Sequence, residues 1–264
     1  MRRRHALLAG LTAAGLLVLT GCTVPNFLQP EPARSEPTGE RVAAELEPFY
    51  SQVLEWERCG EFQCTTATAP LDWSDPSAGE TELALVRQTA RGGERIGSLL
   101  VNPGGPGASG YDFIAESIDY AVGEPLQERY DVVGFDPRGV GRSTPVTCFD
   151  AAEMDDYLFG IPEAERGSDA WIAEVGAAAQ RFGAACAEGT GELLANVDTV
   201  SAARDLDLLR AVLGDDELHY LGYSYGTLLG ATYAELYPER VGRLVLDGAI
   251  DPSASNDEVT QAQA

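Results

Sequence analysis

From residue 68 onward, segments with the apolar pattern of a strand alternate with segments that have the apolar spacing of a helix. Glu82–Ala90 alternates apolar and polar positions, as a half-buried outer strand does. Elsewhere, short continuous apolar runs predict buried strands, and helical spacing predicts helices. These further strands are residues 98–102, 130–135, 218–223 and 243–247, and the helices are residues 199–213 and 225–237. The alternation predicts an α/β fold, with a mostly parallel sheet and helices on both faces.

The N-terminal residues differ in composition from the rest of the chain. A basic start, Met1–His5, precedes a short apolar run and the sequence Leu19-Thr20-Gly21-Cys22, which is typical of a bacterial lipoprotein signal. We therefore expect residues 1–21 to be a signal peptide, Cys22 to carry lipid after export, and residues 22–45 to form a flexible tether. The protein would then lie at the outer face of the cell membrane. An ordinary signal peptide and a secreted product are the alternative.

Four cysteines remain beyond Cys22, and an even number in an exported protein suggests two disulfides. Three connectivities are possible for four cysteines. Local closure favours Cys59–Cys64, which leaves Cys148–Cys186 as the second pair. No His or Cys partner stands at ligand spacing, so neither a metal site nor a cofactor is expected.

Charge narrows the choice of partners. The chain has 264 residues, and its 42 acidic and 18 basic residues give a net charge of −24. Nucleic-acid binding needs clusters of Lys and Arg against the phosphates, so this balance argues against it. The acidity is interpreted as a well-solvated surface, so local motifs rather than charge indicate the function.

A candidate nucleophile lies in Gly222-Tyr223-Ser224-Tyr225-Gly226, between a predicted strand and a predicted helix. In a Gly-x-Ser-x-Gly motif at such a junction, the serine sits on a sharp turn with its hydroxyl exposed above the sheet. The flanking glycines let the strand and the helix approach closely. The start of the helix directs free N–H groups at the site. A glycine-rich packing turn is the alternative.

A second glycine-rich segment, Asn102 to Gly107, directly follows a predicted strand. Acyl transfer creates an oxyanion, which preorganised backbone N–H groups stabilise. In this arrangement one donor is the residue after the nucleophile, Tyr225, and the other comes from the glycine loop, where we favour Gly105 and then Gly104. A phosphate-binding loop is the alternative, but prolines remove donors and no Lys follows.

With these motifs the chain resembles the alpha/beta-hydrolase fold and, within it, the proline iminopeptidase-like serine exopeptidases, most of all the secreted tripeptidyl aminopeptidases of actinobacteria. The residues that carry the resemblance are Cys59 to Cys64, Pro70 to Trp73, Asn102 to Gly107, Asp131 to Ser143, Gly222 to Thr227, Asp247-Gly248 and Asp251-Pro252. The resemblance implies that Ser224 is the nucleophile and that Gly105 and Tyr225 provide the oxyanion hole. It also implies that Asp136–Ser143 shapes a turn rather than reacts.

The same resemblance sets the expected boundaries. Residues 46–249 would be the N-terminal part of the hydrolase core, incomplete at its C-terminal end with about six of eight strands, and residues 250–264 would begin a lid insertion. The family places its catalytic acid after the seventh strand and its histidine after the eighth. Asp247, after the sixth strand, is a possible alternative acid.

The printed sequence has no histidine after Ser224 to act as its base. His219 lies five residues before Ser224 in the same predicted strand. At about 3.3 Å per residue this separates the two backbones by roughly 16 Å. A base must come within about 3 Å of the hydroxyl, so we interpret His219 as a strand residue.

The resemblance implies a serine exopeptidase that cleaves short peptides from free N-termini through an acyl-enzyme on Ser224. Because the base and most of the lid are missing, we expect these residues alone to be inactive and poorly soluble. An esterase on the same fold is one alternative. Another is a non-catalytic lipoprotein that binds peptides or a partner. The missing histidine favours the binding protein, whereas the intact Gly-x-Ser-x-Gly motif opposes it.

Overall fold

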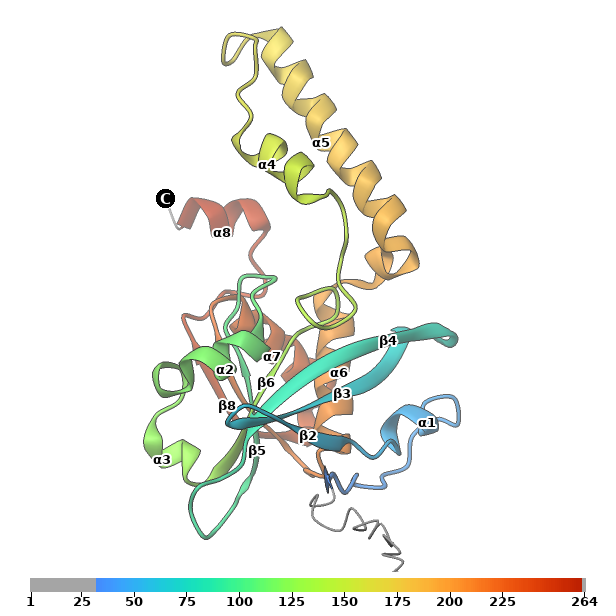
Figure 1. Cartoon of the computed structure of the whole chain (residues 1–264), viewed down its shortest axis with the longest axis vertical. Coiled ribbons are helices and arrows are strands. Elements are labelled where there is room, and N and C mark those ends of the chain that lie inside the picture. Colours follow the sequence, from blue (N-terminus) through green and yellow to red (C-terminus); the bar gives the residue numbers. More distant parts are fainter. Residues whose placement is uncertain (1–31, 263–264) are drawn as a thin grey trace, which may run out of the picture. The chain divides into compact units, whose positions relative to one another are not determined.

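The protein's structure, a computed structural model, describes residues 32–262. Within this part of the chain, the strands form one sheet in the order β1-β2-β3-β4-β6-β5-β7-β8 (Figure 1). The predicted signal peptide, residues 1–21, and Cys22 lie outside the described residues, so both stay predictions.

The sheet is mixed, with an antiparallel half and a parallel half. In the antiparallel half, β1 pairs with β2, β2 with β3, β3 with β4, and β4 with β6. The other half, in the spatial order β6-β5-β7-β8, is parallel throughout. The strands are β1 (Ala33–Arg34), β2 (Glu55–Cys59), β3 (Phe62–Asp72), β4 (Asp75–Gln88), β5 (Gly97–Asn102), β6 (Tyr130–Phe135), β7 (Leu218–Tyr223) and β8 (Val241–Asp247).

The helices connect the parallel strands and extend beyond them. In the described residues they are α1 (Glu47–Tyr50), α2 (Gly110–Ala121), α3 (Glu124–Gln127), α4 (Ala151–Phe159), α5 (Asp169–Thr190), α6 (Thr199–Val212), α7 (Tyr225–Leu236), α8 (Asn256–Ala262) and the short 3₁₀ helices η1 (Gly191–Asn196) and η2 (Pro238–Arg240). No helix in residues 32–262 is long and apolar enough to cross a membrane.

Helices cover both faces of the sheet, as predicted. Neighbouring residues of a strand point to opposite faces, so each strand contributes side chains to two cores. On β6, Val133 faces a core that includes Leu206 of α6, whereas Val132 faces a second core that includes Ile114 of α2. All four side chains are fully buried. The predicted α/β fold is therefore confirmed, although the described residues form eight strands where about six were predicted, because β1 and β2 lie before the segment with a clear alternating pattern.

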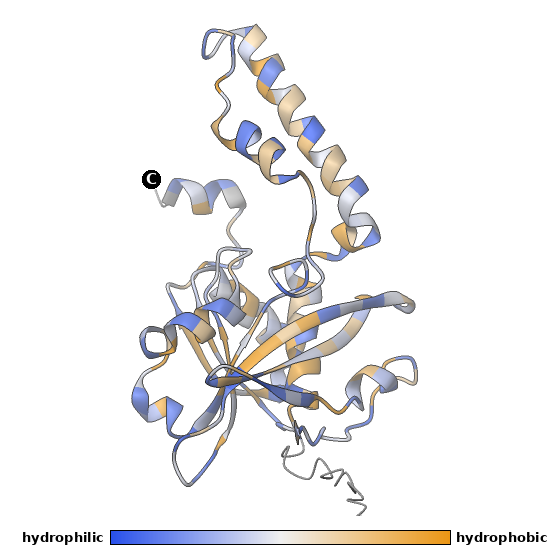
Figure 2. Cartoon of the chain, viewed as in Figure 1, coloured by the Kyte–Doolittle hydropathy of each residue, from blue (hydrophilic) through white to orange (hydrophobic). Residues whose placement is uncertain are grey.

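The prediction of a half-buried outer strand at Glu82–Ala90 is wrong in its position. Residues 82–88 belong to β4, which lies between β3 and β6, and residues 83–86 are buried. Figure 2 shows the apolar colour concentrated along the middle of β4. The alternating pattern indicates a strand, but it does not show that this strand has neighbours on both edges and a covered outer face.

A buried ion pair joins the loop after β6 to helix α6. The guanidinium of Arg138 donates from Nε to Oδ2 of Asp205 at 2.7 Å and from Nη2 to Oδ1 at 2.6 Å. Trp73 donates from Nε1 to Oδ1 of the same carboxylate at 3.0 Å. Burial raises the pKa of Asp205, while the hydrogen bonds from Arg138 act in the opposite direction. Arg138 therefore fastens the turn that the sequence analysis interpreted as structural.

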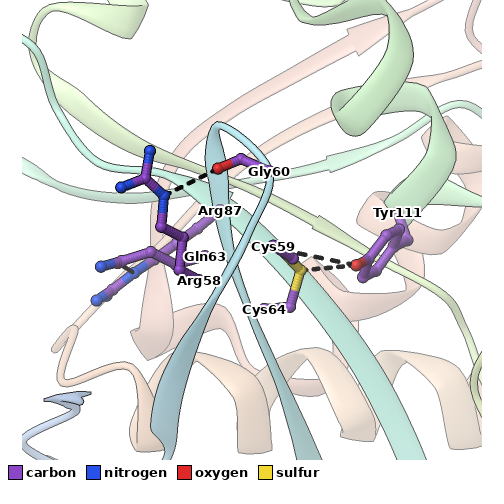
Figure 3. The surroundings of a disulfide bond; sticks show 7 residues. All are labelled: Arg58, Cys59, Gly60, Gln63, Cys64, Arg87 and Tyr111. Atoms are coloured by element: carbon purple, nitrogen blue, oxygen red, sulfur yellow. Dashed lines mark hydrogen bonds between the residues drawn. A yellow bond between two sulfur atoms is a disulfide. The ribbon is translucent and has the colours of Figure 1, made fainter. Parts of the chain in front are cut away.

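Both predicted disulfides, Cys59–Cys64 and Cys148–Cys186, are present in the structure. The first lies at the tip of the β2–β3 hairpin, where Tyr111 of α2 directs its hydroxyl at the two sulfur atoms (Figure 3). Tyr111 Oη lies 2.6 Å from Cys64 Sγ. The hairpin is thus fastened to the start of α2, close in sequence to the glycine loop.

The second disulfide joins the segment before α4 to the end of α5. Between them, Tyr157 and Phe182 stack at 4.7 Å between ring centroids, and Phe149 packs edge-on against both rings. This pair of helices, α4 and α5, was not predicted within the hydrolase core between residues 46 and 249.

The predicted flexible tether, residues 22–45, disagrees with the structure over its described part. Ser35 is buried and its hydroxyl accepts from Leu54 N at 2.9 Å, and Glu40 Oε1 lies 2.8 Å from Arg210 Nη2. Residues 32–45 therefore pack on the domain because polar groups in this segment pair with buried partners. Residues 22–31 of the predicted tether lie outside the described residues.

Candidate active site

Ser224 occupies a strained turn between β7 and α7. Its φ of 53° and ψ of −119° are outside the regions that most residues adopt, and it is the one non-glycine residue of the described chain with positive φ. Its N–H donates to Asp247 O at 2.9 Å, and its carbonyl accepts from Thr227 N at 2.9 Å. A strained serine between a strand and a helix has the geometry that presents a nucleophile.

The two flanking glycines are required by close packing. A Cβ on Gly222 would lie 2.4 Å from Gly226 O, and a Cβ on Gly226 would lie 2.9 Å from Asn102 O. Neither position has room for a side chain. The glycines thus let β7 and α7 approach around Ser224, as the motif predicts.

The glycine loop after β5 lies against the nucleophile. A Cβ on Gly104 would lie 3.0 Å from Ser224 Cβ and 3.1 Å from Tyr225 N. The structure therefore brings the loop and the Gly-x-Ser-x-Gly turn together, although 120 residues separate Gly104 from Ser224 in sequence.

The N–H groups of this loop are not equivalent. Gly104 N–H donates to Asn102 Oδ1 at 2.9 Å, so it is already occupied. Gly105 N–H has no hydrogen-bond acceptor within residues 32–262. Tyr225 begins α7, where the first N–H groups of a helix have no intrahelical partner. This difference supports Gly105 and Tyr225 over Gly104 as the donors for an oxyanion.

A pocket of about 590 Å³ opens beside Ser224. Its walls come from the segment after β8 and from α8: Gly248, Ala249, Ile250, Asp251, Ser253, Ala254, Glu258 and Val259. Two carboxylates, small residues and short apolar side chains thus surround the space in front of the hydroxyl. The sequence analysis assigned these residues to the start of a lid and did not predict that they line a pocket with Ser224.

Asp247, the possible alternative acid, and a second aspartate, Asp251, lie at and just after the end of β8. Asp247 ends β8 with an exposed side chain, and its backbone carbonyl, not its carboxylate, binds Ser224. Asp251 lines the pocket itself, and hydrogen bonds from the side chain and N–H of Ser253 hold the pKa of its carboxyl below the usual value. No group of three or more His, Cys, Asp or Glu side chains in the described chain could hold a metal ion.

His219 lies at the opposite end of β7 from Ser224, as predicted. It is buried, its Nδ1 accepts from Arg243 N at 3.2 Å, and its ring packs edge-on against Tyr130 at 5.4 Å. Burial and the charge of Arg243 lower the pKa of His219, and Asp215 opposes this shift. The imidazole is a neutral structural acceptor rather than a base for Ser224.

Acidification is expected to destabilise the folded chain through His219. Because its pKa is lowered on folding, its contribution to stability is present above about pH 6.5 and is lost as the pH falls through the folded pKa. The difference in urea midpoint between pH 7.5 and pH 5.5 should be smaller in His219→Gln than in the parent chain. An equal difference in both proteins would contradict this assignment.

The fold and this site place the chain in a known family. Residues 97–264 match the family described as alpha/beta hydrolase fold, and the chain belongs to that family. It is 38% identical over 272 residues to the serine protease Hip1 of Mycobacterium tuberculosis, covering 99% of this chain and 49% of that protein. It is 41% identical over 212 residues to the tripeptidyl aminopeptidase of Streptomyces lividans, covering 76% of this chain and 39% of that protein.

A third relative has a different name. The chain is 38% identical over 284 residues to the carboxylesterase B of Mycobacterium tuberculosis, covering 100% of this chain and 52% of that protein. The chain thus spans about half the length of the relatives that it matches along its whole length.

Proposed function

We propose that the complete protein is a serine exopeptidase that releases short peptides from free N-termini. The observation that carries this proposal is the junction of Ser224 with the glycine loop, where two backbone N–H groups are free to bind an oxyanion. Relatives named serine protease and tripeptidyl aminopeptidase support a peptide substrate. In this proposal the substrate occupies the pocket in front of Ser224.

The proposed chemistry is acyl transfer without a metal or other cofactor. Ser224 Oγ attacks the scissile carbonyl while a base takes its proton, and the resulting oxyanion accepts from Gly105 N–H and Tyr225 N–H. The amine leaves with a proton from the same base, and water then hydrolyses the ester. The base and the acid that orients it would belong to the part of the complete enzyme that corresponds to the half of its relatives outside this match.

The proposed location is outside the cell. The sequence before residue 23 supports export, with a lipid anchor on Cys22 holding the enzyme at the membrane surface. Metabolic labelling with a palmitate analogue tests the anchor, since labelling should disappear in Cys22→Ala.

The experiment that tests the activity uses the protein encoded by the complete reading frame. Its rate on a tripeptide anilide with a free amino group is compared with its rate on the N-acetylated form. We expect a preference of about 100-fold or more for the free form, because a site that pairs with an ammonium group is left unsatisfied by an amide. In Ser224→Ala the rate should fall by as much as about 10⁶-fold. Ser117→Ala, at an exposed position on the kink of α2, is the matched control.

An esterase is the second candidate, favoured by the relative named carboxylesterase B. It predicts equal rates on the free and acetylated anilides and much faster hydrolysis of simple acyl esters, again abolished in Ser224→Ala. A non-catalytic binding protein predicts no hydrolysis that depends on Ser224. Either result would contradict the exopeptidase.

A further inference from the structure

The buried hydroxyl of Thr227 links the nucleophile to the pocket. Thr227 is the third residue of α7 and is 1% exposed. Its Oγ1 donates to Ser224 O at 2.6 Å and accepts from Ile250 N at 3.0 Å. One side chain therefore joins the turn that carries Ser224 to the loop that forms one wall of the pocket.

Few side chains could make both bonds in this space. A hydroxyl carries one donor and two acceptor lone pairs, and here both functions are used at once. Valine has nearly the same shape but neither function, so it would leave Ile250 N–H without its partner. Serine would retain both bonds and lose one methyl group.

The loop after β8 has a second contact with the nucleophile. Ser224 N–H donates to Asp247 O at 2.9 Å, and Gly248 lies close enough that a Cβ there would be 3.7 Å from Ser224 N. The N–H of Ser224 is thus bound by Asp247, and its carbonyl is bound by Thr227, which also binds Ile250. Thr227 holds the far end of that segment.

We propose that Thr227 is a positioning residue that sets the pocket wall at residues 248–250 relative to the Ser224 hydroxyl. This inference rests on the proposed function of Ser224 as the nucleophile. Thr227 itself does not touch the substrate. It acts through Ser224 O and Ile250 N, so its loss should affect the binding of substrates that fill the pocket more than the reactivity of the hydroxyl.

Amide hydrogen exchange on the protein from the complete reading frame tests the link without requiring activity. In Thr227→Val, exchange at Ile250 should become about tenfold faster, as expected for one lost hydrogen bond. Thr227→Ser should stay within about threefold of the parent, and amides of β5 and β6 should be unchanged in both variants. Equal acceleration at all these sites, or none at Ile250, would overturn the proposal.

If Thr227→Val does not fold, the exchange rates of the parent protein provide the test. Ile250 N–H should exchange at least about tenfold more slowly than the N–H groups of Ala249 and Asp251, for which the structure shows no acceptor in the described chain. Similar exchange at all three amides would show that Thr227 does not hold the loop.

The functional readout uses the protein from the complete reading frame. For a tripeptide anilide, Thr227→Val should raise KM about tenfold, while kcat on a small acetyl ester should change less than about threefold; Thr227→Ser should restore both. A fall in kcat on the ester with unchanged KM for the peptide would contradict a role in setting the pocket wall. Absence of any Ser224-dependent hydrolysis would refute the proposed function, whereas the exchange experiment would still decide the role of Thr227.

Discussion

Replacing Asp205 by alanine is expected to destabilise the folded chain by about 3–5 kcal/mol, because it leaves the guanidinium of Arg138 as an uncompensated buried charge. The side chains of Arg138 and Asp205 are 1% and 2% exposed, so water cannot replace the lost carboxylate. Arg138 would retain its bonds to carbonyl oxygens, such as Leu71 O at 3.0 Å, but these carry no full charge. Urea unfolding of the variant and the parent measures the difference.

The same arginine-rich turn offers a matched control. Arg142 pairs with Asp112 at 2.6 Å, but these side chains are 51% and 41% exposed. Asp112→Ala should therefore cost less than about 1 kcal/mol, since solvent screens an exposed pair. If Asp205→Ala and Asp112→Ala have similar costs, the buried pair does not fasten the turn to α6.

Alanine at position 104 is expected to destabilise the chain more than alanine at position 107, by about 1–3 kcal/mol. Gly104 and Gly107 share a φ of +98°, so a side chain suffers the same left-handed strain at each. Their surroundings differ. A Cβ on Gly104 would lie 2.5 Å from Tyr223 O, whereas a Cβ on Gly107 would have nothing within 4 Å. The difference between the two variants thus isolates the contact between loop and nucleophile.

Urea unfolding of Gly104→Ala and Gly107→Ala, at equal ionic strength, provides this comparison. Equal midpoints in the two variants would show that the loop does not press against the Ser224 turn, and the oxyanion hole proposed here would lose its geometric basis. Equal slopes of the transitions would establish that the two variants unfold between the same states.

The parts of the fold that the sequence predicted well are those encoded locally. Helix α6 was predicted over residues 199–213 and is observed at Thr199–Val212, with Asp198 accepting from Ser201 N as its N-cap. The turn at Ser224 was predicted because its motif and its flanking elements lie within a few residues. In both cases the signal and the structure occupy the same short segment.

The errors occurred where distant residues decide the structure. Glu40 was placed in a flexible tether, but it pairs with Arg210, which is 170 residues away. The wall of the pocket depends in the same way on where residues after β8 pack, which a local pattern does not show. The role of Thr227 likewise depends on Ile250, which lies 23 residues further along the chain, so the motif from Gly222 to Thr227 does not show it.

The side chain of Asn102 has a consequence for the lifetime of this protein. Its Oδ1 accepts from Gly104 N–H, whereas the neighbouring Gly105 N–H has no acceptor in the described residues. Asparagine usually deamidates when the backbone nitrogen of the next residue attacks its side chain. That residue here is Pro103, whose nitrogen carries no hydrogen. The amide that shapes the loop is therefore protected from this route of deamidation.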